Sequence, residues 1–119
     1  MTSSFKLDYT FAERSAEAAR IKEKYIDRVP IVVERGAKNT GSLESLDKKK
    51  YLCPADLSLG QFLYVIRKRL HLPSTEAIFL FTEDGTIPST SALVRDVYLQ
   101  HKDQDGFMYL TYQGENVFG

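Results

Sequence analysis

Apolar positions recur with the period of an α-helix in three segments of this chain. The first stripe consists of Phe11, Ala18, Ile21 and Tyr25. Thr10 and Glu13 have the spacing of a capping box at its start, in which each side chain accepts a hydrogen bond from the backbone N–H of the other residue. The pattern therefore predicts a helix over residues 11–24.

A second amphipathic stripe lies in the middle of the chain and consists of Leu59, Phe62, Leu63, Ile66 and Leu70. Ser58 and Gln61 repeat the capping-box spacing in front of it. Cations end the stripe, and the negative end of a helix dipole favours them there. We expect a helix over residues 58–70. A third, shorter helix is expected over residues 91–101, with Leu93, Val97 and Tyr98 facing inward.

Four short apolar runs have the character of strands. They lie at residues 30–34, 49–53, 77–82 and 108–113. Gly, Asn, Thr and Ser are frequent in residues 36–45, which we interpret as a loop between the first two strands. Pro54 should stop the second strand, and Asp84-Gly85 is typical of a turn after the third. Gly106 and Gly114 flank the last run and resemble turn residues.

The order of these elements is helix, strand, strand, helix, strand, helix, strand. It fits neither a doubly wound α/β sheet nor a helical bundle. Two strands, a long helix across their face and two further strands form the β-grasp arrangement. The sequence therefore predicts an α+β fold, the ubiquitin-like β-grasp with a four-stranded mixed sheet, preceded by extra helical sequence.

Composition narrows the classes of function. The chain has 119 residues, of which 43% are hydrophobic and 27% charged, as is typical of one globular domain. Sixteen basic and sixteen acidic residues cancel, so no overall field favours nucleic acid or an anionic membrane. The single cysteine and the lack of an apolar leader predict a reducing, cytoplasmic setting. No run approaches the ~20 apolar residues of a transmembrane helix.

Residues suited to catalysis or metal binding are scarce. His71 and His101 stand at predicted helix ends, which suits solvated side chains or partners of the helix dipole. The chain has no His-x-x-His or Cys-x-x-Cys pair for a metal and no Walker-type loop for a nucleotide. Cys53 has no basic neighbour at a fixed spacing that would activate its thiol. We therefore expect no enzyme activity, no metal and no cofactor.

Three lysines, Lys48, Lys49 and Lys50, lead into the second predicted strand. Charged residues on an edge strand discourage uncontrolled pairing with other sheets. Alternatively, the exposed edge accepts an extended peptide as an added strand, and pockets for alternate side chains select it. Acidic peptides would then be favoured. The spacing alone leaves both interpretations open.

Longer motifs make the second interpretation more specific. They are Tyr25-Ile26-Asp27-Arg28-Val29-Pro30, Leu46-Asp47-Lys48-Lys49-Lys50-Tyr51-Leu52, Gly60-Gln61-Phe62, Ile66-Arg67-Lys68-Arg69-Leu70 and Val117-Phe118-Gly119. Through them the chain resembles the autophagy ubiquitin-like modifiers, the family of light-chain 3 and the GABA-receptor-associated protein. The resemblance implies two short N-terminal helices packed on the sheet. It divides the single domain, residues 1–119, into a helical extension (1–27), a β-grasp core (28–113) and a flexible conjugation tail (114–119).

Members of that family are joined through a C-terminal glycine to the amine of phosphatidylethanolamine, and they recruit cargo receptors and adaptors to the forming autophagosome. The resemblance makes Gly119 the lipid-conjugated residue. It implies activating and conjugating enzymes with catalytic cysteines, and a processing or deconjugating cysteine protease, as partners. It also implies a cytoplasmic monomer that reaches the autophagosome membrane when lipidated. Most members are made with residues after this glycine, so the sequence fits either a precursor made in mature form or the processed form.

The docking site of that family takes peptides of the form aromatic-x-x-aliphatic, often flanked by acids. The matching positions for its aromatic pocket are Glu17, Ile21, Pro30, Lys50, Leu52 and Phe107. Those for its aliphatic pocket are Tyr51, Cys53, Pro54, Leu57, Phe62 and Val65. Arg28, Lys48 and Arg69 would meet the acidic flanks. Ile21 and Phe62 also fit the apolar stripes of their helices, so a plain core role is the alternative for both.

Two further alternatives follow. Some members of the family use a second face, here Ile78-Phe79-Leu80, although an apolar strand is expected there for the core alone. A different class of function is an unconjugated adaptor that links receptor tails or cytoskeleton in vesicle traffic through its basic face.

Overall fold

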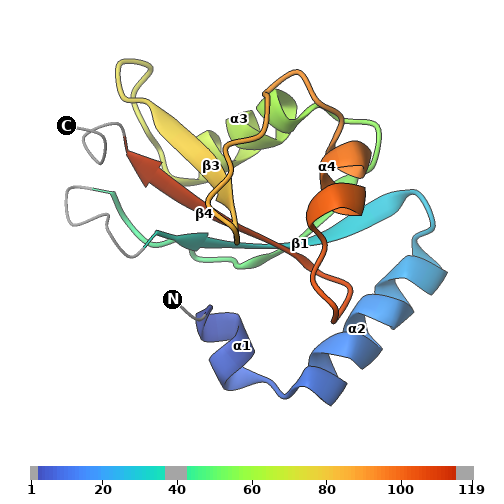
Figure 1. Ribbon diagram of the computed structural model, residues 1–119. Coiled ribbons are helices and arrows are strands. Elements are labelled where there is room, and N and C mark those ends of the chain that lie inside the picture. Colours follow the sequence, from blue (N-terminus) through green and yellow to red (C-terminus); the bar gives the residue numbers. More distant parts are fainter. Residues whose placement is uncertain (1–2, 37–42, 115–119) are drawn as a thin grey trace.

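The computed structural model describes residues 3–36 and 43–114 (Figure 1). The helices in these ranges are α1 (Ser4–Asp8), α2 (Phe11–Lys24), α3 (Leu59–Arg69) and α4 (Val94–His101). The strands are β1 (Arg28–Arg35), β2 (Lys50–Pro54), β3 (Ile78–Thr82) and β4 (Met108–Gly114). Gly119, the predicted conjugation residue, lies outside the described residues, as do residues 37–42 of the predicted loop.

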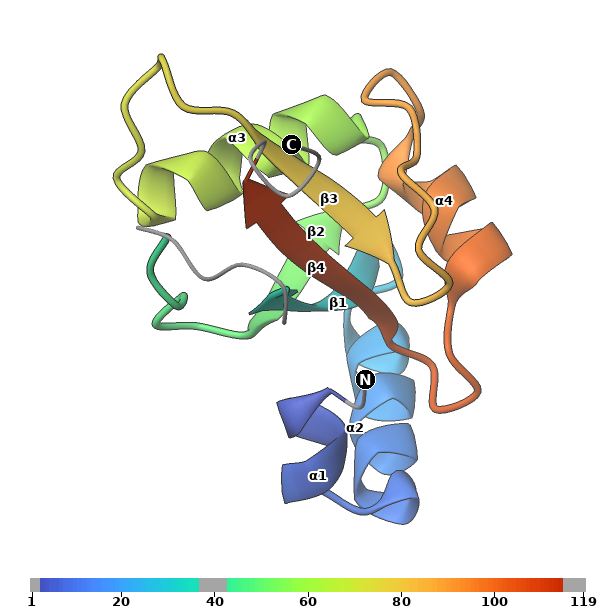
Figure 2. The same cartoon turned by 60° about the vertical axis from the view of Figure 1, so that its left-hand side comes forward.

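The strands form one sheet in the order β2-β1-β4-β3. β1 pairs with β2 and β3 pairs with β4 in antiparallel fashion, while the central pair, β1 and β4, is parallel. Figures 1 and 2 show α3 crossing one face of this sheet and α1 and α2 lying against the opposite face. This is the predicted mixed sheet of the ubiquitin-like β-grasp, and β2 is an edge strand as expected.

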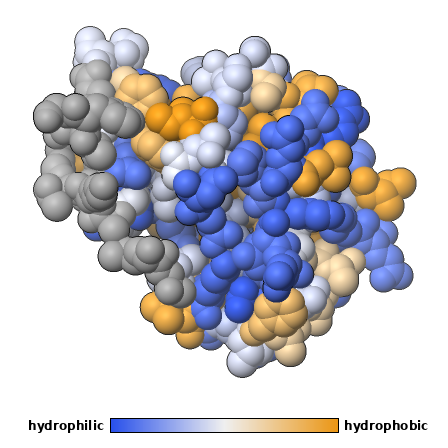
Figure 3. Space-filling model, viewed as in Figure 1, coloured by the Kyte–Doolittle hydropathy of each residue, from blue (hydrophilic) through white to orange (hydrophobic). Residues whose placement is uncertain are grey.

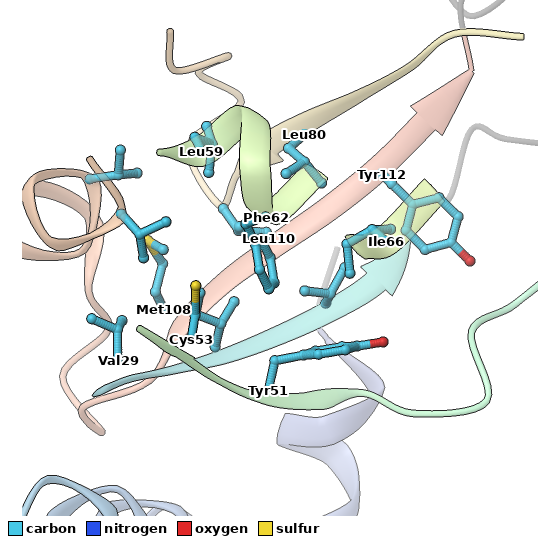
Figure 4. Close-up of a cluster of buried hydrophobic side chains, with 14 of the residues drawn as sticks. Val29, Tyr51, Cys53, Leu59, Phe62, Ile66, Leu80, Met108, Leu110 and Tyr112 are labelled. Carbon is cyan, nitrogen blue, oxygen red and sulfur yellow. The ribbon is translucent and has the colours of Figure 1, made fainter. Parts of the chain in front are cut away.

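The main hydrophobic core lies between α3, α4 and the sheet. Phe62 and Ile66 of α3 point toward Leu110 of β4 and Tyr51 of β2 (Figure 4). The rings of Tyr51 and Phe62 meet edge to face, with centroids 5.7 Å apart and an interplanar angle of 84°. Aromatic pairs favour this geometry because the positive edge of one ring meets the negative face of the other.

A smaller cluster lies on the opposite face, under α1 and α2. It consists of Phe5, Ala18, Val32, Phe107 and Tyr109, with Ile21 partly buried beside it. Side chains of a strand alternate between the two faces of a sheet. The sheet is therefore buried on both faces, and the second layer is the N-terminal extension that the sequence predicted.

Both predicted capping boxes are present. Thr10 and Glu13 exchange side-chain to backbone hydrogen bonds of 2.8 and 3.1 Å at the start of α2. Ser58 and Gln61 do the same at the start of α3, also at 2.8 and 3.1 Å. Each box satisfies two backbone N–H groups that a helix end would otherwise leave unpaired.

The predicted apolar stripe of α2 is only half correct. Ala18 is buried, but the side chains of Phe11 and Tyr25 at the two ends of the helix are exposed. α2 extends past the sheet at its N-terminal end (Figure 2), so Phe11 has little to pack against there. Arg14 is buried instead, because it reaches a carboxylate of the core.

The fourth helix begins at Val94 rather than at residue 91. The residues before it form a turn that holds the start of α3. The carbonyl oxygens of Thr90 and Ala92 accept hydrogen bonds of 2.9 and 2.8 Å from the backbone N–H groups of Gly60 and Leu59. This contact between distant segments outweighs the local preference for helix.

Several strand and loop boundaries also differ from the predictions. Pro54 is the last residue of β2 rather than the residue that stops it, which suits an edge strand because the missing N–H removes no necessary bond. Gly114 belongs to β4 and pairs with Ile78, so it is not a turn residue. Leu43, within the predicted loop, is buried in the main core. Gly106 does occupy a turn, with φ of +96°.

Candidate functional site

The outer edge of β2 offers backbone hydrogen-bonding groups. Within the described residues β2 pairs only with β1. The N–H of Val33 donates to the carbonyl of Lys49 at 2.9 Å, and antiparallel pairs alternate, so Lys50 and Leu52 direct their backbone groups outward. The side chain of Arg28 donates to the carbonyl of Leu52 at 3.1 Å. The edge is therefore open to an added strand once Arg28 moves.

Alternate residues of β2 face opposite sides of the sheet. Tyr51 and Cys53 point into the main core, toward α3 (Figure 4). Lys50 and Leu52 point the other way, toward α2 and α1. The edge strand thus separates two side-chain environments, one on each face.

A groove of about 580 Å³ lies on the α2 side of β2. Its walls come from α1, α2 and the lysine-rich start of β2: Phe5, Asp8, Tyr9, Glu17, Ile21, Lys48, Lys49, Lys50 and Leu52. Five predicted site residues are therefore brought together here, namely Glu17, Ile21, Lys48, Lys50 and Leu52. Ile21 is half-buried, so it serves both as groove wall and as edge of the smaller cluster.

The sequence did not identify the contribution of α1 to this groove. The rings of Phe5 and Phe107 meet edge to face with centroids 5.4 Å apart, and the ring of Tyr9 is tilted against that of Phe5 at 4.9 Å. Phe107 and Pro30, predicted for the aromatic pocket, are fully buried behind this wall and do not line the groove. Ser3, which caps α1, and Phe5 within that helix are the signal in the sequence from which its docking could have been found.

The predicted aliphatic pocket has a different character. Tyr51, Cys53 and Phe62 are buried members of the main core, so the alternative reading of Phe62 as a core residue is the one that its burial favours. Pro54 and Leu57 are half-buried and Val65 is 40% exposed. Leu57 packs against the main core and Val65 lies on α3, so these two residues carry apolar surface on the α3 side of the edge.

Hydrophilic side chains form a broad band on the face that Figure 3 shows, and hydrophobic ones lie in separate patches beside it. In the part of the chain that the structure describes, no helix is both long and apolar enough to cross a membrane. The same residues contain no group of three potential metal ligands.

Comparison with known proteins agrees with this geometry. Residues 13–119 match the family model described as "Autophagy protein Atg8 ubiquitin like". The chain belongs to the Atg8 family of ubiquitin-like autophagy proteins. It is 54% identical to autophagy-related protein 8B of Oryza sativa subsp. indica over 98% of this chain and 96% of that protein. It is 53% identical to autophagy-related protein 8 of Candida glabrata over 100% of this chain and 98% of that protein.

A solved structure supports the same assignment. The crystal structure of Trypanosoma brucei ATG8 superposes with a TM-score of 0.90 and is 40% identical, with 97% of each chain covered. The resemblance to autophagy modifiers that the motifs indicated is thereby confirmed, as is the ubiquitin-like fold. The groove at β2 is therefore a feature of an Atg8-family domain.

The basic residues around this Atg8-family edge already contact groups of their own chain. Lys50 pairs with Glu17 across the groove. Arg69 pairs with Asp47 at 2.9 Å, and this hydrogen bond lowers the pKa of Asp47 below its ordinary value. Lys48 lies over the ring of Tyr51, 5.2 Å from its centroid. An acidic ligand would have to break these contacts before it could pair with the same basic residues.

Polar contacts hold α1 at its N-terminal end and at its middle residue, Lys6. The Nζ of Lys6 lies 2.8 Å from Glu83 and 2.6 Å from Asp103. The hydroxyls of Ser3 and Ser4 donate to the carboxylate of Glu34. A helix of five residues is not stable by itself, so these contacts and the burial of Phe5 hold it in place.

A buried network positions α2. The guanidinium of Arg14 donates to Asp105 at 2.6 Å, and the same carboxylate accepts from Tyr109 at 2.5 Å and from the backbone of Phe107 at 2.8 Å. Burial, followed by the bond to Asp105, raises the pKa of Tyr109 far above its ordinary value. Because a buried charge is tolerated only with such partners, the network fixes α2, and so Glu17 and Ile21, relative to the sheet.

Glycine allows α2 to approach closely at the next position. Gly106 has φ of +96°, and a Cβ placed there would lie 2.9 Å from the Cβ of Ala18.

Two other candidate positions are buried on the α3 side of the sheet. Burial raises the pKa of the Cys53 thiol to about 11, which keeps it protonated and unreactive at neutral pH. Ile78 and Leu80, at the proposed second face, are buried in the main core.

Proposed function

We propose that this chain is a conjugatable docking module: its Gly119 is joined to phosphatidylethanolamine, and its sheet edge recruits cargo receptors to the autophagosome. Membership of the Atg8 family supports the setting in autophagy. The observation that carries the docking proposal is the open edge of β2, with a groove on one face and half-exposed apolar residues on the other.

The spacing of the peptide motif fits this edge. In an added strand, residues three positions apart point to opposite faces, because side chains alternate with a period of two. The aromatic residue of an aromatic-x-x-aliphatic peptide would enter the groove beside Glu17, Ile21 and Leu52. The aliphatic residue would then meet Leu57 and Val65 on the α3 side. Backbone groups of Lys50 and Leu52 would supply the strand hydrogen bonds.

Such a site should bind single motifs weakly. Burying an aromatic side chain of 150 to 250 Å² contributes roughly 4 to 6 kcal/mol before ordering costs. After those costs, a dissociation constant on the order of micromolar is expected. Many copies on one membrane would raise the effective affinity through avidity.

Conjugation requires other proteins. Amide formation from a carboxylate and an amine expels water and needs an activated carboxyl group, and this sequence has no nucleotide-binding loop. We infer that activating and conjugating enzymes with catalytic cysteines, with ATP at the first, act on Gly119, and that a cysteine protease processes or reverses the product. The chain itself would be a substrate rather than an enzyme. Two acyl chains then anchor it stably, at about 0.8 kcal/mol per buried methylene.

Reconstitution tests the conjugation proposal. The protein is mixed with the activating and conjugating enzymes of a related Atg8 system, ATP and liposomes containing phosphatidylethanolamine. Mass spectrometry should show an adduct with the mass of protein plus lipid minus water. Deleting Gly119 should abolish it, and an adduct that forms without Gly119 would refute the assignment. If Gly119→Ala leaves the cellular function intact, the unconjugated adaptor is the better description.

Peptide titration tests the docking proposal separately. A neutral peptide containing Trp-x-x-Leu should bind the wild-type protein, and Leu52→Ala together with Lys50→Ala should weaken it at least about tenfold because groove wall and rim are lost. Leu99→Ala, an exposed position on α4, is the matched control and should leave affinity unchanged. Equal affinity of all variants would exclude this site.

A further inference from the structure

Lys50, one of three lysines that line the groove, is paired with Glu17 of α2. Lys50 and Glu17 both line the groove and form an ion pair across it, with their side chains 44% and 24% exposed. Glu17 reaches Lys50 because α2 is fixed on the sheet by the Arg14 and Asp105 network. A peptide carboxylate that approaches Lys50 on this face meets the Glu17 carboxylate already bound there.

The same arrangement recurs on the opposite face of the edge strand. Arg69 at the end of α3 pairs with Asp47, and their side chains are 37% and 77% exposed. Asp47 lies just before the lysines, in the segment that leads into β2. On each face of the docking edge, therefore, a cation is paired with an acid of the same chain.

We propose that Glu17 and Asp47 are internal competitors that set which acidic peptides this edge accepts. This inference rests on the proposed docking function and concerns its selectivity. A peptide acid two residues before the aromatic anchor shares the face of the groove, because side chains alternate, and competes with Glu17 for Lys50. A peptide acid one residue before the aromatic anchor points to the α3 face at the same end of the strand, where Asp47 and Arg69 lie, and competes with Asp47 for Arg69. Peptides without such acids leave both internal pairs intact.

Competition of this kind reduces the increase in affinity that an acidic residue gives to a peptide. The peptide must break an existing ion pair to form its own, so the net gain is a difference between two similar contacts. Exposed ion pairs are individually weak, and releasing the cation should improve Kd by about two- to fivefold. Glu17 is the less exposed of the two acids and should have the larger effect.

The experiment compares three peptides with one Trp-x-x-Leu core. The first is neutral, the second has Asp two residues before Trp, and the third has Asp one residue before Trp. Each is titrated by calorimetry into wild-type protein, Glu17→Gln, Asp47→Asn and Asp8→Asn at low salt. Asp8 is the matched control, because it lines the same groove and has no ion pair with a described residue. Its substitution changes the charge of the groove without releasing a lysine.

We expect Glu17→Gln to tighten only the second peptide and Asp47→Asn to tighten only the third. The gain from Glu17→Gln should disappear in the background of Lys50→Gln, which shows that it acts through that lysine. Equal gains from Glu17→Gln and Asp8→Asn would indicate a general charge effect and overturn the proposal. Unchanged or weaker binding of the acidic peptides, with the neutral peptide still bound, would overturn it while leaving the docking function standing. Failure of the neutral peptide to bind the wild-type protein would refute the docking function and this inference together.

Discussion

The two faces of the sheet are built on different physical principles. The α3 side is a large apolar core, and its members make few directional contacts. The α2 side has five buried apolar residues, supplemented by Arg14, Asp105, Lys6 and Glu34 in polar contacts. Apolar burial is not directional, whereas hydrogen bonds depend on angle and distance. The α3 side should therefore supply most of the stability, and the α2 side should set the shape of the groove.

The largest effect on stability is expected from the α3 side. Ile66 is fully buried among α3, β1 and β4. Ile66→Ala should reduce the free energy of unfolding by about 2 to 5 kcal/mol, because it removes buried methylenes and leaves a cavity. Urea unfolding measures this loss. Affinity for a Trp-x-x-Leu peptide should remain near that of wild type, at a temperature where the variant is folded. A loss below about 1 kcal/mol would contradict the division between the faces.

Asp105→Asn should affect both stability and binding. It leaves Arg14 buried without a charged partner, which should cost about 3 kcal/mol. It should also reduce the affinity for a Trp-x-x-Leu peptide several-fold, because Glu17 and Ile21 are no longer held in place. Urea unfolding and calorimetry measure the two effects.

Ile66→Ala is the control for Asp105→Asn, since it destabilises the protein without touching α2. Arg14→Gln in the Asp105→Asn background should recover part of the stability by removing the unpaired charge. If Asp105→Asn lowers stability but leaves peptide affinity unchanged, the network is structural only.

Gly106→Ala should show how closely α2 must approach the sheet. An alanine at positive φ costs about 1 kcal/mol by itself, and the contact with Ala18 should add about 1 kcal/mol more. Gly85→Ala is the matched control, because Gly85 has φ of +85° but nothing lies within 4 Å of its added Cβ. Thermal unfolding of both variants separates backbone strain from contact. Equal losses of stability in the two variants would mean that α2 moves aside to accommodate the added methyl group.

The smallest effect concerns pH. Burial raises the pKa of the Cys53 thiol from 9.0 to about 11, so the unfolded chain loses this proton at lower pH than the folded one. The stability that Cys53 contributes is therefore complete below pH 9 and falls as pH rises toward 11, by about 1 kcal/mol at pH 10. Unfolding of wild type and Cys53→Val across this range isolates the thiol. A constant difference between them would contradict the buried, protonated state.

Much of the fold followed from local patterns. The capping boxes at Thr10 and Ser58 and the stripe of α3 were predicted because each depends on residues within a few positions of one another. Five groove residues were also predicted, from the resemblance of their motifs. Glu17 and Ile21 are four positions apart, so any helix places them on one face, and this spacing can be seen in the sequence.

The errors share a cause. Phe11 and Tyr25 were predicted to face inward, and residues 91–93 to be helical, because local periodicity takes no account of what lies opposite. The carbonyls of residues 90 and 92 accept hydrogen bonds from the start of α3, which keeps residues 91–93 out of the helix. The N-terminal end of α2 extends past the sheet, which leaves Phe11 exposed. Pro30 and Phe107, assigned to the aromatic pocket, are buried, and the ring of Phe5 lies against that of Phe107.

The sequence by itself determined the order of helices and strands, the β-grasp class and the place of the lysines on an edge, because periodicity, caps and turns act between near neighbours. Only the tertiary structure decided that α1 forms a groove wall and that Glu17 forms an ion pair with Lys50. It also decided that Arg14 is buried. These depend on partners far apart in the chain, as with Lys6 and Asp103, which are 97 positions apart. Such contacts form only after packing has placed the elements, so no local pattern contains them.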